Sequence, residues 1–121
     1  MMTRSSPAGG RGPVVAAPGP ISPRAARDMQ SHAAEAARLL KALANEQRLM
    51  VLCHLVKGPL SVGELNEQLP LSQSALSQHL AVLRKCGCVR TEREAQSVRY
   101  SLRPGVVARL LGVLHTELCE R

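Results

Sequence analysis

The chain has 121 residues and a formal net charge of +7, from 16 Lys and Arg against nine Asp and Glu. This length suits one domain with a tail, and the positive charge predicts an anionic partner. The chain has no Phe, no Trp and one Tyr, Tyr100. That composition argues against stacking of bases on aromatic side chains, and so against most modes of single-strand and RNA binding.

No apolar run approaches the length of a bilayer span. The start of the chain is broken by Pro and Gly and lacks the continuous apolar core of a signal peptide. We therefore expect a cytoplasmic protein with no membrane partner.

Residues 1–24 differ from the rest in composition. They hold five of the eight prolines and four of the nine glycines, with three arginines and no acidic residue. Such a segment buries too little to offset its ordering entropy, so it is predicted to be a disordered tail. A passive linker is favoured over a weak nonspecific DNA contact. Residues 25–121 are predicted to form the folded domain.

Two helices are predicted in the first half of this domain. The first begins near residues 23–26 and runs to about Leu43, through an Ala-rich stretch of high helix propensity. Asn45 can cap a second helix that runs through Val56 and is ended by the Gly-Pro pair at 58–59.

The middle of the chain predicts a helix-turn-helix. Val62, Leu65 and Leu69 fall on one face of a short helix, at spacings of three and four. Pro70 cannot continue this helix, because it lacks an N–H and its ring clashes with the preceding turn. Ser72 is a good N-cap for the helix that follows.

The second helix of this pair is amphipathic, with a polar face that lacks acidic residues. Its polar face has short hydroxyls and amides and no acidic residue, which suits base edges and phosphates in a major groove. From this segment alone, an ordinary surface helix pair remains the alternative. The residues expected to be buried are Ala75, Leu76, Leu80 and Leu83. The residues predicted to reach base edges are Gln73, Ser74, Ser77, Gln78 and His79, and Ser72 is predicted to hold a phosphate.

Residues 88–102 predict two short strands around a turn near Glu94 to Ser97. A helix-turn-helix followed by a basic hairpin is a winged helix, whose wing lies over the DNA backbone or in the minor groove. A solvated strand face is the alternative for these arginines. It loses weight because five cations would cluster near the second helix, namely Arg84, Lys85, Arg90, Arg93 and Arg99. Of these, Arg84, Arg93 and Arg99 are predicted to hold phosphates.

A last helix is expected from Pro104, in its first turn, to about Glu120. It carries an apolar stripe that a small winged domain cannot cover, as does the first helix around Leu40. We therefore predict that the first and last helices pack against their copies in a symmetric dimer, which matches a palindromic operator. The stripe consists of Val107, Leu110, Leu111, Leu114 and Leu118.

This mainly α arrangement, with five helices and a two-stranded β-wing before the last helix, resembles the ArsR/SmtB family of bacterial regulators. The resemblance covers roughly residues 33–119 and is most specific at residues 41–53, 71–80 and 93–100. These segments look like the metal-independent branch that senses sulfide as persulfides and polysulfides. The resemblance implies a homodimeric repressor that binds operator DNA without a metal or other cofactor. It also implies that oxidation of a redox-sensing pair, Cys53 and Cys119, releases the DNA.

The residues themselves point less clearly to that pair. Cys53 lies in an almost wholly apolar run, where a small buried hydrophobe is the more common role. Cys119 lies beside Glu117 and Glu120, whose charges disfavour its thiolate. A direct disulfide needs α-carbons within about 7 Å. Inserted sulfur atoms relax that limit, so a wider pair would select polysulfide over peroxide.

Cys86 and Cys88 depart from that branch. A structural role is favoured, while a soft metal or thiol chemistry of their own stays open. If they bound arsenite or a thiophilic metal, the protein would be a metalloid-responsive repressor. His115 and His54 are expected to be surface residues, so no metal site is predicted.

The sequence also bears on two other classes of protein. No Gly-rich phosphate loop or catalytic constellation is present, so an enzyme is not expected. A winged-helix protein-interaction module remains an alternative, although its contact face should carry a large apolar patch. Steeply salt-dependent binding to duplex DNA would distinguish DNA recognition from that module.

Overall fold

The computed structural model describes residues 22–120. The chain divides into two compact units at Ala34. The first described helices are α1 (Pro23–Gln30) and α2 (Ala33–Leu43). The predicted tail, residues 1–24, lies almost wholly outside the described residues and stays a prediction.

The single helix expected up to Leu43 is wrong, because two helices stand in its place. Ser22 caps α1 by accepting the Ala25 amide at 3.1 Å. The helix ends at Ser31, whose hydroxyl donates to the Asp28 carbonyl at 2.8 Å. A serine that bonds to nearby backbone competes with the helical ladder, which explains the break. The described residues therefore form six helices rather than five.

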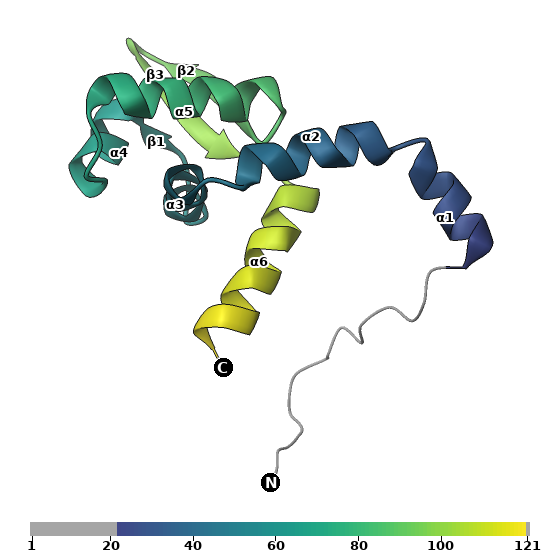
Figure 1. The fold of residues 1–121 in the computed structure, drawn as a ribbon. Helices are drawn as coiled ribbons and strands as arrows, with labels where there is room; N and C mark the ends of the chain where they lie inside the picture. The colour runs from purple at the N-terminus through teal and green to yellow at the C-terminus, as the bar shows by residue number, and fades with distance from the viewer. Residues whose placement is uncertain (1–21, 121) are drawn as a thin grey trace, which may run out of the picture. The chain divides into compact units, whose positions relative to one another are not determined.

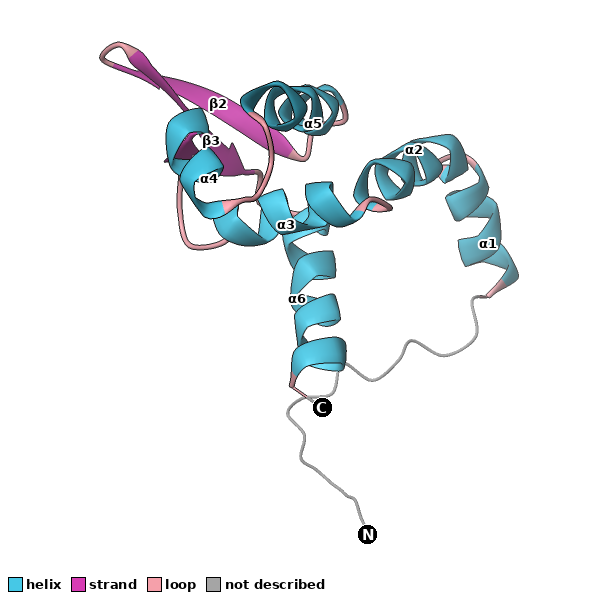
Figure 2. Ribbon diagram, turned by 60° about the vertical axis from the view of Figure 1, so that its left-hand side comes forward, coloured by secondary structure: helices cyan, strands magenta, loops and turns pink. Residues whose placement is uncertain are grey.

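The second unit contains the winged helix-turn-helix (Figure 1). Asn45 caps α3 by accepting the Arg48 amide at 2.9 Å, as predicted. Figure 2 shows the two long strands projecting from the helices as a twisted ribbon. The remaining elements are α3 (Glu46–Leu55), β1 (Leu60–Ser61), α4 (Val62–Gln68), α5 (Gln73–Lys85), β2 (Val89–Glu94), β3 (Ser97–Leu102) and α6 (Val106–Cys119).

The wing belongs to a three-stranded antiparallel sheet in the order β1-β3-β2, not to the two-stranded hairpin expected. The hairpin pairs Val89 with Leu102 and Glu94 with Ser97, which confirms the predicted turn. Ala95, in the turn, adopts a left-handed φ of 56°. The extra strand arises because the two extended residues before α4 pair with Tyr100 and Arg99 of β3.

The core is aliphatic. Leu76, Leu80 and Leu83 of α5 are buried as predicted, and Leu65 and Leu69 meet them from the α4 side. This packing holds the polar face of α5 outward. The other buried members are Leu43, Val51, Leu52, Leu55, Cys88, Val89, Val107 and Leu111.

Helix α6 buries only its first half. Pro104 precedes the helix instead of lying in its first turn, because Gly105 turns the chain with a φ of 126° and becomes the N-cap. Val107 and Leu111 reach the core, whereas Leu114 and Leu118 are 40% and 57% exposed. Among the described residues, no helix is long and apolar enough to cross a membrane.

Candidate nucleic-acid interface and cysteine sites

Side-chain bonds to the backbone hold the start of α4, the turn after it and the start of α5. Ser61 and Glu64 form a capping box, each accepting the other's backbone amide, at 3.1 and 2.9 Å. Asn66 Nδ2 donates to the Leu71 carbonyl at 2.7 Å and closes the turn. Ser72 then caps α5 by accepting the Ala75 amide at 3.0 Å. These bonds and the leucine core hold α5 as a rigid, outward-facing helix.

The structure places the predicted base-contacting residues on one end of α5. His79 is half-buried, so it presents only part of its ring. Ser72 is exposed, although its hydroxyl already accepts the capping bond. The fully exposed members of this face are Gln73, Ser74, Ser77 and Gln78. None of these residues is acidic, which leaves the face compatible with a polyanion.

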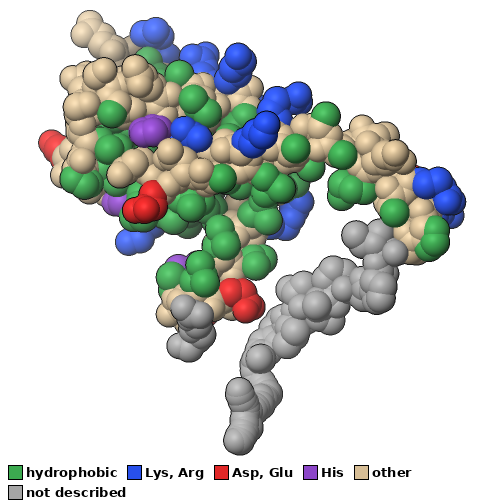
Figure 3. Space-filling view, in the orientation of Figure 1, with side chains coloured by type: hydrophobic (Ala, Val, Ile, Leu, Met, Phe, Trp, Pro, Cys, Tyr) green, Lys and Arg blue, Asp and Glu red, His purple; other side chains and the backbone are tan. Residues whose placement is uncertain are grey.

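Cations flank this face on two sides. Arg84 is exposed in the last turn of α5, and Arg90 and Arg93 are exposed on β2. In Figure 3, Lys and Arg side chains gather along the edge of the molecule that α5 and the hairpin occupy. Arg84 and Arg93 are therefore exposed, which is compatible with the phosphate contacts predicted for them.

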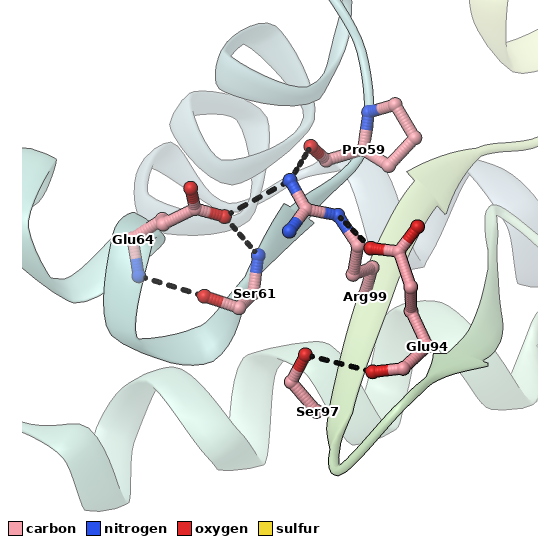
Figure 4. Close-up of polar contacts among 6 residues, drawn as sticks. All are labelled: Pro59, Ser61, Glu64, Glu94, Ser97 and Arg99. Carbon is pink, nitrogen blue, oxygen red and sulfur yellow. Dashed lines mark hydrogen bonds and ion pairs between the residues drawn. The ribbon is translucent and has the colours of Figure 1, made fainter.

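Arg99 has internal partners instead of an open face (Figure 4). One guanidinium nitrogen, Nη2, donates to the Pro59 carbonyl at 3.0 Å and lies 3.2 Å from a Glu64 carboxylate oxygen. Nε lies 3.7 Å from Glu94 on β2. With its side chain only 29% exposed, Arg99 ties the wing to α4 and to the start of β1. The phosphate role expected of Arg99 from the sequence stays a prediction.

Glu64 also lies at this junction, and it was not among the residues predicted from the sequence. The Ser61 amide bond, first, and then the Arg99 charge and the Ser61 hydroxyl lower the pKa of its carboxyl against an opposing desolvation. Glu64 is therefore ionised at neutral pH. The serine three residues before a glutamate was a readable signal for this cap.

Cys53 and Cys119 are both exposed. The buried hydrophobe that the apolar run favoured for Cys53 is therefore wrong, because the side chain lies on the outer face of α3. Partial burial of the thiol raises the pKa of Cys53, and the charge of Cys119 at the end of α6 raises it further. Lys57 and His54 line the same shallow groove as Cys53.

Cys86 and Cys88 lie side by side, with their sulfur atoms 2.8 Å apart. Cys88 is fully buried and Cys86 is half-buried. Burial, followed by the contact with Cys86, raises the pKa of Cys88 to about 12. Among the residues from Ser22 to Glu120, no group of three or more His, Cys, Asp or Glu could hold a metal ion. His54 and His115 have partners of their own, the Met50 carbonyl and Glu120.

Comparison with known proteins gives one consistent set of relatives. Residues 45–91 match the family model described as bacterial regulatory protein, arsR family. The transcriptional activator HlyU of Vibrio cholerae is 50% identical over 99 residues, which cover 82% of this chain and 92% of HlyU. The biofilm growth-associated repressor of Xylella fastidiosa is 45% identical over 94 residues, or 78% of this chain and 82% of the repressor.

Solved structures agree. Reduced HlyU from Vibrio cholerae superposes with a TM-score of 0.71 at 52% identity, over 77% of this chain and 98% of HlyU. The repressor BigR from Xylella fastidiosa gives a TM-score of 0.71 at 43% identity, over 79% of this chain and 98% of BigR. The homodimeric winged helix-turn-helix DNA-binding domain of Mb0332 from Mycobacterium bovis gives a TM-score of 0.66 at 29% identity, over 82% of this chain and 88% of that domain.

Proposed function

Because the chain belongs to the arsR family of bacterial regulatory proteins and is a DNA-binding transcriptional regulator, we propose that it represses its target promoters as a homodimer and releases them when sulfur links Cys53 to Cys119. The observation that carries the DNA-binding part is the acid-free polar face of α5, held outward between exposed arginines. An interaction module would be expected to show an apolar patch at this position.

The DNA contacts divide by role. The residues proposed for base edges are Gln73, Ser74, Ser77, Gln78 and the exposed part of His79. Ser72, Arg84 and Arg93 are proposed at phosphates, where they position the helix without reading sequence. We assign Arg99 to holding the wing, since its donors face Pro59, Glu64 and Glu94.

The homodimer is supported by the exposed half of α6. Leu114 and Leu118 lie one turn apart on the helix face that continues from buried Val107 and Leu111, and Leu40 of α2 is also exposed. Apolar side chains of this size gain about 1.5–3 kcal/mol each when fully buried. A second copy of the chain would cover them, and Mb0332 is a homodimer. The two copies of α5 in the dimer would then bind two operator half-sites that lie about one turn of the DNA helix apart.

The switch is supported by the exposure of both thiols and by the charge of Cys119, which, after partial burial, raises the pKa of Cys53. A polysulfide anion would meet Lys57 beside Cys53. The Cys53 thiolate would attack an inner sulfur of the polysulfide, take up a chain of at least two sulfur atoms and release the shortened polysulfide. The Cys119 thiolate would then attack an inner sulfur of that chain and expel its terminal sulfur as hydrosulfide, which leaves a bridge with at least one inserted sulfur. Both thiols are then oxidised, and polysulfide sulfur is reduced to hydrosulfide. Since α3 packs directly on α5, tying α3 to the end of α6 would move the recognition helices.

The test is operator binding by fluorescence anisotropy, on reduced protein before and after treatment with inorganic polysulfide. We expect the wild type to lose binding and the Cys53→Ser and Cys119→Ser variants to keep it. Cys86→Ser is the matched control and should respond like the wild type. Unchanged binding by treated wild type would refute the switch and leave the DNA-binding role standing. Equal cross-linking by peroxide, read by mass spectrometry, would refute selectivity for polysulfide.

A further inference from the structure

The turn that joins α5 to the wing has a defined backbone geometry. Cys86 is the C-cap of α5, and Gly87 adopts a φ of 81°. The amides of Gly87 and Cys88 donate to the carbonyls of Arg84 and Leu83, at 3.1 and 2.9 Å. This is a Schellman motif, which reverses the chain and brings the two cysteines onto the same side. The contact between their sulfur atoms is therefore set by the fold.

The two thiols differ sharply in access. Cys86 is half-buried and lines a groove at the surface, whereas Cys88 has no exposed surface and belongs to the core. Burial and the contact with Cys86 raise the pKa of Cys88, which keeps it protonated and able to donate to a Cys86 thiolate. Cys86 also lies 3.5 Å from the Leu83 carbonyl, its partner while protonated. An external reagent can thus reach only Cys86, and Cys88 is already in place to react with what forms there.

The groove beside Cys86 is positively charged. Arg38, Lys85 and Arg103 line it, against one carboxylate from Glu35. The thiolate form of a cysteine is the nucleophile in thiol–disulfide exchange. The cations of the groove attract reagents that carry carboxylates.

We propose that Cys86 and Cys88 form a second thiol site, separate from Cys53 and Cys119, that is oxidised by anionic low-molecular-weight organic disulfides. This inference does not depend on the proposed polysulfide switch. The pair lies at the junction of α5 and β2, so a bond formed there acts on both elements that face DNA.

The reaction is two successive thiol–disulfide exchanges. The Cys86 thiolate attacks one sulfur of the disulfide, the bond between the two reagent sulfurs breaks, and one reagent thiolate leaves with the electron pair. Cys88 then loses its proton to that thiolate and attacks Cys86 Sγ, which expels the second reagent thiolate. Overall, the two cysteines lose two electrons and two protons, and the disulfide becomes two thiols.

The experiment uses oxidised glutathione and the full chain carrying Cys53→Ser and Cys119→Ser, so that only this pair can react. Intact-mass spectrometry should show a product lighter by two hydrogens. Adding Cys88→Ala, which keeps the core apolar, should stop the reaction at one glutathione on Cys86. Adding Cys86→Ser should abolish the reaction. Modification of the Cys86→Ser protein at the parent rate, or full oxidation without Cys88, would overturn the proposal.

The role of the positive groove is tested with disulfides of opposite charge. The rates with oxidised glutathione and with cystamine, a cationic disulfide, are each divided by the rate for the same chain unfolded in urea. The folded protein should favour oxidised glutathione several-fold, and Arg103→Ala should reduce that preference. Equal normalised rates for the two reagents would refute the assignment to anionic disulfides.

Discussion

The wing arginine Arg93 offers the sharpest test of the DNA-binding mode. It is exposed on β2, opposite Val98 and next to the turn, while Arg99 one strand away has partners inside the protein. Replacing Arg93 by Ala removes an outward charge and leaves the Arg99 contacts in place. We expect weaker binding to every duplex, because a phosphate contact is independent of sequence.

The size of the effect follows from counterion release. Each phosphate neutralised on B-DNA contributes about 0.9 to the slope of log affinity against log salt, so two copies in a dimer contribute about 1.8. Raising the salt concentration from about 50 to about 200 mM should therefore reduce the ratio of wild-type to Arg93→Ala DNA affinity by about twelvefold.

Fluorescence anisotropy on an operator duplex and on a scrambled duplex, over a salt series, measures both quantities. Lys57→Ala is the matched control. Lys57 is exposed just after α3, in the groove beside Cys53, so this change removes one positive charge outside the proposed DNA face. Its slope should equal that of the wild type. If Arg93→Ala gives a line parallel to the wild type, the wing does not contact phosphates and the reasoning fails.

Three further outcomes are expected. Asn66→Ala should lower the free energy of unfolding by about 1 kcal/mol, because its amide bond closes the turn before α5; urea denaturation beside Gln68→Ala, an exposed change on the same helix, checks this. Leu118→Asp should give a monomer by sedimentation, whereas Thr116→Asp, on the opposite side of α6, should stay dimeric. Cys88, whose pKa is raised from 9.0 to about 12, should have about a thousandfold less thiolate near pH 8 than an ordinary cysteine. It should resist iodoacetamide until the chain unfolds, and rapid labelling of native protein would contradict this.

Several features were readable from the sequence because their causes are local. The spacing of Val62, Leu65 and Leu69 defines one helix face, and Ser72 caps the next helix through a bond three residues away. The turn between Glu94 and Ser97 and the cap at Asn45 are local in the same sense. The leucines of α5 could be assigned to the core because their period leaves only one apolar face.

Other features depend on residues that are far apart in the chain. Arg99 donates to the Pro59 carbonyl 40 residues earlier, and sequence patterns do not carry that pairing. Cys53 stands in a run with almost no polar residue, so periodicity could not say which face is exposed. Only the packing of α3 on α5 and β3 decides it.

The chain alone therefore determined that a polar recognition helix and a basic wing would form, since caps, turns and apolar spacing act within a few residues. The tertiary structure decided which arginines remain exposed and which thiols meet. Those outcomes depend on the pairing of β1 with β3, on the exposed end of α6, and on the reversal at Gly87 that brings Cys86 against Cys88. Charge and reactivity of a side chain are set by its neighbours in space, and folding brings those neighbours together from distant parts of the sequence.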